Sequence, residues 1–408
     1  MAEVTNYEQV ARGEIEEVNR HAGDNPIKVG ILTPLTGPGD PVAGFLVARG
    51  ARLGAEYVRE NGGALGRQIE FVMRNDQASA YADGMQRSVV GELAKLAMID
   101  KVTAVLGQWH LRTAPYAAEL CERIGVPMFV ENGHSAVTAS GYRTIFRTYF
   151  SIEDRVPLML DLLAGQGLRR LAILAADTVF GLETADTLEA YGTARHGMEF
   201  LRFDFPQETT TDLLPQLRKI AEFEPDAIIN DGVVRTNYLI VKQAAELGLR
   251  PGIPMMVTFG FPMRSADFWR EAGPAGNGIL WPATCYRPSW PGLTDIGRWF
   301  TQRYTDRYGS MPPDTCLSAF TDVTLVARAV AAAGTDERDA VIAALEAEEF
   351  PTWRGPVRFV RGDRHWHHSP PPLQIMQYQS VGQDFDEAVV VFPEAVADGS
   401  YRSPAELT

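Results

Sequence analysis

The sequence contains little cysteine, and its three cysteines are widely spaced. Cys121, Cys285 and Cys316 form no CxxC pair, so they indicate neither a disulfide framework nor a structural zinc site. Free cysteine usually behaves as a small buried residue, and we expect this of all three. The chain also lacks a run of roughly 18 to 20 apolar residues, the length that a membrane span requires. We therefore expect no direct insertion into a membrane.

Basic residues are fewer than acidic ones. The chain has 38 Lys and Arg against 52 Asp and Glu, which gives a net charge of −14. No basic cluster interrupts this excess, so we expect no nucleic acid as a partner. The composition, with 45% hydrophobic and 22% charged residues, is that of a folded protein, and the length predicts two or three domains.

Motifs of common enzyme and cofactor sites are absent as well. The sequence has no GxxxxGK[ST], GxSxG or HExxH pattern. The glycines of Asn61–Gly66 follow a predicted helix and precede a strand, which is the wrong context for binding a dinucleotide. Nothing in the spacing of His110, His134 and Asp177 favours catalysis over binding. We expect no enzyme activity, no catalytic residue, no cofactor and no bound metal.

One histidine cluster leaves three interpretations open. His365, His367 and His368 lie close enough in sequence to bind a transition metal or to contact a ligand. They also precede Pro370–Pro372, which favours a plain surface or crossover loop without a metal or ligand role.

The N-terminal segment carries no signal peptide. Residues 1–25 are polar and acidic, without the basic and apolar regions of a secretory leader. Either the protein stays in the cytoplasm, or this is a mature form in which Met1 replaces a leader. We expect residues 1–26 and 393–408 to form peripheral tails.

From Ile27 onward, short β-branched runs alternate with helical patterns. Ile27–Thr33 reads as a strand and Leu46–Asn61 as a helix; further strands are predicted at Gln68–Arg74, Val102–Leu106 and Pro127–Val130. The alternation begins again after Arg147. Such spacing predicts parallel sheets built from βαβ units, in two α/β halves of similar plan.

Small, polar and aromatic residues follow many of these predicted strands. In parallel sheets, ligands bind outside the carboxyl ends of the strands, where free N–H groups of helix starts favour an anionic group such as a carboxylate. The candidates are an apolar wall and a set of hydrogen-bonding groups: Trp109, Phe180, Phe259 and Phe261 for the wall, and His110, Asn132, His134 and Asp177 for the hydrogen bonds.

The segment Ile27–Pro38 resembles the opening strand of type I periplasmic binding proteins, in the leucine/isoleucine/valine-binding branch. Other matching segments follow in order to about residue 380: Gly50-Ala51, Glu60–Arg67, Asn75-Asp76, Val105–Gly107, Gly125–Pro127, Arg147-Thr148 and Gly355–Phe359. The resemblance implies a two-lobed α/β fold, each lobe a mostly parallel sheet flanked by helices, with three crossovers between the lobes. We expect residues 27–147 and 277–353 in lobe 1, and residues 148–276 and 354–392 in lobe 2.

The resemblance also implies a function. Family members are extracytoplasmic, periplasmic solute-binding proteins of ABC importers, which close on a small-molecule ligand between the lobes and then dock on a membrane permease. A ligand that contacts both lobes only in the closed form stabilises that form. A different class of function also stays open, a cytoplasmic sensor of amide-type ligands on the same fold that controls a regulatory partner.

Family ligand positions map onto several candidates. The hydroxyl residue that holds the ligand carboxylate corresponds to about Leu111, beside His110 and Thr113. The next strand end corresponds to Asn132, Gly133 and His134, an aromatic position to Phe180, and a tyrosine position to Val233 or Val234.

The acidic residue that pairs with the ligand's ammonium group in the family falls near Phe259. Burying an unpaired ammonium is costly, so an ordinary α-amino acid fits only if Asp177 or Asp231 substitutes. A hydrophobic or aromatic carboxylate, or an amide-like molecule, suits the aromatic lining better. Tyr149 and Phe150, just after the first crossover, are expected to add to this lining.

Overall fold

The computed structural model describes residues 6–37, 40–77, 86–233, 235–265 and 267–407. The chain forms two compact units, Met1–Ser151 with Tyr286–Pro371 (unit 1), and Ile152–Cys285 with Pro372–Thr408 (unit 2). It passes from one unit to the other three times. Each unit is a mainly parallel sheet flanked by helices, which confirms the expected fold class.

Unit 1 is built on a five-stranded parallel sheet with the order β2-β1-β3-β4-β5. Its strands are β1 (Ile27–Thr33), β2 (Ile69–Asn75), β3 (Ala104–Leu106), β4 (Met128–Phe129) and β5 (Ile145–Phe146). The pairs β1/β2, β1/β3, β3/β4 and β4/β5 are all parallel, so their carboxyl ends meet at one edge. A separate hairpin is formed by β11 (Glu349–Thr352) and β12 (Gly355–Arg358).

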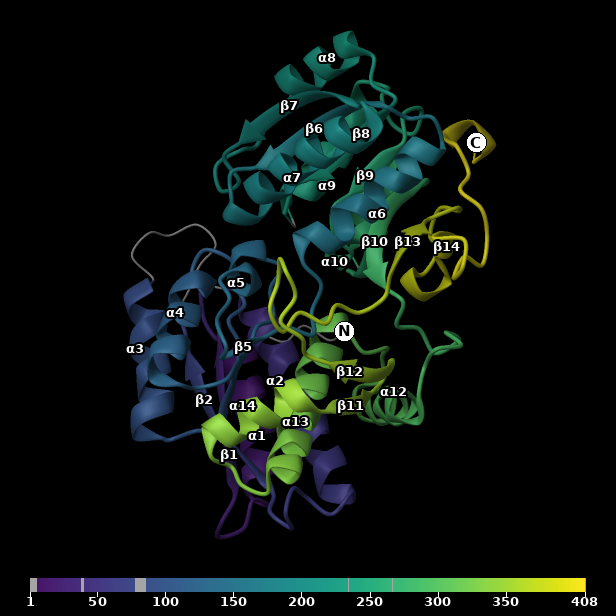
Figure 1. Ribbon diagram of the computed structural model, residues 1–408. Coiled ribbons are helices and arrows are strands. Elements are labelled where there is room, and N and C mark those ends of the chain that lie inside the picture. Colours follow the sequence, from purple (N-terminus) through teal and green to yellow (C-terminus); the bar gives the residue numbers. More distant parts are fainter. Residues whose placement is uncertain (1–5, 38–39, 78–85, 234, 266, 408) are drawn as a thin grey trace. The chain divides into compact units, whose positions relative to one another are not determined.

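Helices cover both faces of this sheet (Figure 1). They are α1 (Tyr7–Asn19), α2 (Pro41–Glu60), α3 (Gln86–Ala94), the π-helix η1 (Lys95–Ile99), α4 (Ala114–Ile124), α5 (Ser135–Ala139), α12 (Asp295–Tyr308), α13 (Asp314–Ala333) and α14 (Arg338–Ala347). Residues of α2 and α13 pack with Val29, Ile31 and Phe129 on one face, and residues of α3 and α4 pack with Val105 and Met128 on the other. The sequence pattern over Tyr81–Met98 predicts one helix; α3 forms part of it from Gln86, and residues 81–85 lie outside the described residues.

Helices α2 and α13 pack closely because α2 carries glycine at the contact. A Cβ atom at Gly50 would collide with the carbonyl oxygen of Cys316, and one at Gly54 would collide with Val323. By length and composition, α13 qualifies as a possible membrane span, which corrects the expectation that no segment of the chain would. In the structure, however, most of α13 is buried in unit 1, as the central helix of a folded core is.

The sequence predicts a peripheral tail for residues 1–26, and this prediction is wrong for residues 7–19. Residues 7–19 form α1, which buries Ala11, Ile15 and Val18 in the core of unit 1. These positions follow the i, i+4, i+7 spacing of an amphipathic helix, but acidic residues surround them.

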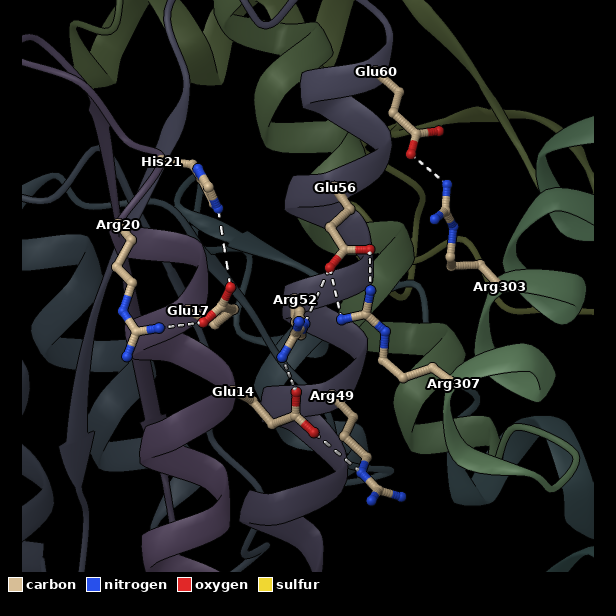
Figure 2. A network of polar contacts seen from close by, with 10 residues as sticks. All are labelled: Glu14, Glu17, Arg20, His21, Arg49, Arg52, Glu56, Glu60, Arg303 and Arg307. Carbon is tan, nitrogen blue, oxygen red and sulfur yellow. Dashed lines mark hydrogen bonds and ion pairs between the residues drawn. The ribbon is translucent and has the colours of Figure 1, made fainter.

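Charged contacts also hold α1 in place. Buried Glu14 lies 2.7 Å from Arg52 and 3.6 Å from Arg49, both on α2. Glu56 in turn contacts Arg52 at 3.0 Å and Arg307 of α12 at 2.8 Å, so one network joins three helices (Figure 2).

Unit 2 contains a seven-stranded sheet with the order β14-β13-β10-β9-β8-β6-β7. Its strands are β6 (Arg170–Ala176), β7 (Glu199–Phe205), β8 (Ala227–Asp231), β9 (Met255–Val257), β10 (Ile279–Thr284), β13 (Leu373–Gln377) and β14 (Val389–Phe392). The strands from β7 to β10 are parallel, whereas β13 and β14 add to the sheet in antiparallel orientation. Its helices are α6 (Ile152–Gly165), α7 (Val179–His196), α8 (Leu214–Phe223), α9 (Arg235–Glu246), α10 (Phe261–Arg264) and α11 (Phe268–Ala272), with short 3-10 turns at Gly273–Gly276, Phe385–Glu387 and Pro404–Glu406.

All three expected domain boundaries differ from the structure. The first was placed after Arg147, but unit 1 continues to Ser151, and Thr148 bonds to Asp322 of the same unit. The second was placed before residue 277, but β10 pairs with β9 and β13, so the change of unit follows at Cys285. The third was placed at residue 353, but Val357 and Phe359 pack in the core of unit 1, which extends to Pro371.

Candidate functional site

At the carboxyl edge of unit 1, the side chain of Gln108 connects two loops. Its Nε2 donates to Asp76 Oδ2 at 2.8 Å, and its Oε1 accepts from the backbone N–H of His110 at 2.8 Å. The Gln108 carbonyl accepts from Asn132 Nδ2 at 2.5 Å, and Asn132 Oδ1 accepts from the N–H of His134 at 3.1 Å. Three strand-end loops therefore form one hydrogen-bonded unit.

His110 is almost buried and electrically neutral near pH 7. It is 7% exposed, and burial lowers the pKa of its imidazole to about 4. Its Nε2 finds no hydrogen-bond partner among the described residues. Thr113 is fully buried, and its hydroxyl donates to the His110 carbonyl at 3.2 Å. This hydrogen bond stabilises the loop. Trp109 and Leu111 are partly exposed beside them.

Arg147 holds the next loop of this edge. Its guanidinium donates to the His134 carbonyl at 2.8 Å, to Thr138 Oγ1 at 2.7 Å and to His368 Nδ1 at 2.9 Å. Arg147 is fully buried and was not among the residues expected in the site. Gly133 is partly exposed in the same loop.

The histidine cluster has protein partners at each position. His367 is buried, stacks on Phe146 at 4.5 Å, and its Nε2 lies 3.0 Å from Glu346 Oε1. His365 Nδ1 lies 3.0 Å from Thr138 Oγ1, and His368 contacts Arg147. These contacts favour the third interpretation, in which the segment is a loop that fastens the chain to β5.

Two buried carboxyl groups lie behind this edge. Phe129 and Phe146 face the α2–α13 side of the sheet, so strand alternation directs Glu131 and Thr148 to the same side. There the hydroxyl of Thr148 donates to Asp322 Oδ1 of α13 at 2.6 Å. Glu131 Oε1 and Asp322 Oδ2 have no hydrogen-bond partner among the described residues.

Burial controls the charge of this pair. It raises the pKa of Asp322 to about 7, although the hydrogen bond from Thr148 and the charge of Arg354 act in the opposite direction. Burial also raises the pKa of Glu131 well above its usual value, and the charge of Asp322 adds to the rise. Both carboxyls are therefore held toward their neutral forms.

At the carboxyl edge of unit 2, two phenylalanines meet. The rings of Phe180, at the start of α7, and Phe259, after β9, lie 5.4 Å apart and nearly perpendicular. Both are partly exposed. Behind them lies Arg155, which is 2% exposed; its guanidinium stacks on Phe180 at 4.4 Å and donates to Thr184 Oγ1 at 2.8 Å.

The two acidic residues considered as ammonium partners have other surroundings. Asp231 is fully buried at the end of β8 and accepts from Thr258 Oγ1. Burial raises its pKa to about 8, although the hydrogen bond from Thr258 and the charge of Arg155 lower it. Asp177 is exposed and accepts from the N–H of Gln207 at 2.9 Å.

The remaining candidates make contacts within their own units. Val233 packs partly against the core of unit 2, and its carbonyl accepts from Gln207 Nε2 at 2.8 Å. Val234 lies outside the described residues. Tyr149 stacks on Phe150, with ring centres 4.2 Å apart, near the end of the first segment of unit 1.

The structure thus brings the candidates together as two separate groups, one at the carboxyl edge of each sheet. Sequence reasoning missed the buried polar residues behind both edges: Gln108, Glu131, Arg147, Arg155 and Asp322. Gln108 and Glu131 directly follow predicted strands, and this position was the available signal for them. Arg155 and Asp322 lie within helices, and Arg147 follows a two-residue strand, so the sequence around these residues does not mark them as part of a site.

Polar and aromatic groups at the carboxyl ends of parallel strands are typical of α/β proteins that bind small ligands. A model of the periplasmic binding protein family matches residues 26–383. The chain therefore belongs to this family of solute-binding proteins of ABC transporters, and the resemblance found in the sequence is confirmed.

Individual relatives are more distant. The chain is 25% identical over 346 residues to a leucine-, isoleucine-, valine-, threonine- and alanine-binding protein of Pseudomonas aeruginosa, covering 82% of this chain and 85% of the relative. A leucine-binding protein of Thermotoga maritima superposes with a TM-score of 0.74 at 18% identity, covering 90% and 98% of the two chains. A solute-binding protein from R. palustris, whose crystal structure contains benzoate, superposes with a TM-score of 0.73 at 22% identity, covering 93% of this chain and 99% of the other. At these identities the two structures support the fold, and all three proteins are described as binding proteins, not as enzymes.

Proposed function

We propose that the chain is the periplasmic solute-binding protein of an ABC importer and that its ligand is a small aromatic or hydrophobic carboxylate. The ligand contacts the carboxyl edges of both units, and closure of the units around it creates the form that docks on the membrane permease. Binding energy drives this closure, because only the closed form offers both sets of contacts. No covalent step is involved.

The observation that carries the proposal is the pair Phe180 and Phe259 at the edge of unit 2. Two partly exposed rings at about 5 Å offer one face and one edge to an apolar or aromatic group, as aromatic packing prefers. Phe259 also occupies the position that the family resemblance gives to the acidic partner of an ammonium group.

Neither nearby acid supplies that missing partner. With its pKa raised to about 8, Asp231 is mainly neutral at pH 7, and its burial disfavours ionisation. Asp177 is exposed to water, where an ion pair contributes little. Neither Asp231 nor Asp177 would therefore compensate the buried ammonium group of an α-amino acid, whereas an acid without an amine needs no such partner.

In unit 1, His110 is the group that we assign to the ligand's carboxylate. A neutral imidazole donates through one ring nitrogen, and Nε2 of His110 has no partner among the described residues. The loop of Asn132 and Gly133 is tied to the His110 loop by the bond from Asn132 Nδ2 to the Gln108 carbonyl.

The experiment that tests the ligand class is calorimetric titration of the full chain with benzoate, 3,4-dihydroxybenzoate, leucine and valine. We expect the aromatic acids to bind and the amino acids to bind more weakly or not at all. Differential scanning fluorimetry gives an independent check, since a ligand at 100 times its Kd stabilises the folded protein by about 2.7 kcal/mol. Binding of leucine without binding of either aromatic acid would contradict the proposal.

A matched pair of variants tests the site. Phe180→Ala removes half of the aromatic pair, and a loss of about 2 kcal/mol corresponds to roughly 30-fold weaker binding. Phe223→Ala is the control, because Phe223 is also partly exposed and carries an arginine, Arg170, over its ring at 3.9 Å. Phe223 is the last residue of α8, and its partner Arg170 is the first residue of β6. Phe180 lies beyond the last residue of β6, so the control site is at the opposite end of this strand. Equal loss of affinity in both variants would contradict the assignment of the site.

A further inference from the structure

Gln108 differs from the residues that we expect to touch a ligand. It is fully buried, and both polar atoms of its side chain and its carbonyl oxygen are all engaged. Its partners come from three different loops, after β2, β3 and β4. A residue with this set of contacts determines where the loops lie relative to each other, without touching the ligand itself.

The hydrogen bonds require an amide at this position. An ionised Asp76 only accepts, and the backbone N–H of His110 only donates, so Nε2 must face Asp76 and Oε1 must face His110. Glutamate would place a second carboxylate against Asp76. An apolar residue would leave a buried carboxylate and a buried N–H without these partners, which costs more than the bonds contribute when formed.

The backbone beside Gln108 requires a glycine at position 107. Gly107 has a φ of 134°, and a Cβ at this position would collide with the carbonyl oxygen of Leu32. Only glycine fits at position 107, and at the next residue the Gln108 carbonyl accepts from Asn132 Nδ2. Through Asn132 Oδ1 the contact continues to the N–H of His134, whose carbonyl is held by Arg147.

We propose that Gln108 is a positioning residue for ligand binding, which sets the loops of His110 and Asn132 in register through its bond to Asp76. The part of this inference that concerns affinity rests on the proposed function. The part that concerns the order of the loops does not.

A charge swap tests the proposal. Gln108→Glu sets two carboxylates 2.8 Å apart unless one takes up a proton, so the loops hold together at low pH and separate as the pH rises. In the double variant Gln108→Glu/Asp76→Asn, the Asn amide donates to Glu, and the second Glu oxygen still accepts from His110. The net charge is that of the wild type. Asp76→Asn alone keeps an acceptor for Gln108 and has a smaller effect than Gln108→Glu.

Two readouts are measured on the full chain from about pH 5.5 to pH 8.5. The first is hydrogen exchange of the segment 107–113 by mass spectrometry, which needs no ligand. We expect exchange to accelerate with pH in Gln108→Glu beyond the intrinsic pH effect seen in the wild type, and to return to wild-type rates in the double variant. The second is the Kd for benzoate and leucine, which we expect to weaken about tenfold or more at high pH in the single variant only.

The outcomes separate the two proposals. If the wild type binds neither probe, the proposed ligand class fails, while the exchange measurement still decides the role of Gln108. If Gln108→Glu exchanges and binds like the wild type at high pH, or if the double variant folds but recovers neither property, Gln108 is not a positioning residue. Circular dichroism of each variant establishes that it is folded.

Discussion

The buried carboxyl of Asp322 makes the stability of the protein depend on pH in a direction opposite to that of a paired carboxylate. Its ordinary pKa is 3.8, and burial raises it to about 7 in the folded state. The folded protein thus keeps a proton that the unfolded chain loses. The contribution of Asp322 to stability is therefore largest below the unfolded pKa, falls as the pH rises from about 4 to 7, and levels off above the folded pKa.

The magnitude follows from the size of the shift. About three pH units at roughly 1.4 kcal/mol per unit give about 4 kcal/mol of destabilisation at pH 8 relative to pH 4. Asp322→Asn removes this titration and keeps an oxygen that accepts from Thr148. We expect the variant to gain stability over the wild type progressively across this window, by up to about 4 kcal/mol.

Urea unfolding followed by circular dichroism, from about pH 4.5 to pH 8.5, measures this difference. Asp363→Asn is the control, because Asp363 is an exposed aspartate of unit 1. It removes one aspartate charge from the surface of unit 1 and leaves the buried carboxyl in place. If the difference between the wild type and Asp322→Asn stays constant from pH 4.5 to pH 8.5, then Asp322 does not carry a raised pKa and the reasoning is wrong.

Three further predictions concern other parts of the chain. Glu14→Ala leaves Arg49 and Arg52 without their partner on α1 and should destabilise the protein by about 3 kcal/mol in thermal unfolding. The control Glu17→Ala, on the same helix, removes only exposed contacts (Figure 2) and should cost under about 1 kcal/mol. Equal losses in the two variants would contradict the role of the network. Gly54→Ala should lower the melting temperature, because the added methyl group meets Val323, and an unchanged value would show that the helices separate without cost. An NMR titration should find no protonation of His110 above about pH 5, since burial lowers its pKa to about 4.

Much of the fold follows from local sequence patterns. The β-branched run Ile27–Thr33 forms β1 with the expected bounds, because a strand buried on both faces reads as a continuous apolar run. The two-residue strand β5 was missed, since Ile145-Phe146 is too short to show any periodicity. Helix α1 was missed because its buried stripe is narrow and lies among acidic residues.

The candidate site was predictable only in part, for a different reason. His110 and Asn132 lie in the loops that follow β3 and β4, so the parallel sheet indicates where they lie. Arg155 reaches the edge of unit 2 from the first turn of α6, and Asp322 reaches Thr148 across 174 positions of the sequence. Such contacts depend on which helix covers which strand, and no local pattern encodes them.

A crystal structure of the full chain with benzoate tests the central claim most directly. The account predicts the aromatic ring against Phe180 and Phe259 of unit 2, with the carboxylate accepting a hydrogen bond from His110 of unit 1. A ligand bound away from the carboxyl ends of the strands, or a complex with leucine whose ammonium is held by an ionised acid of unit 2, would contradict it.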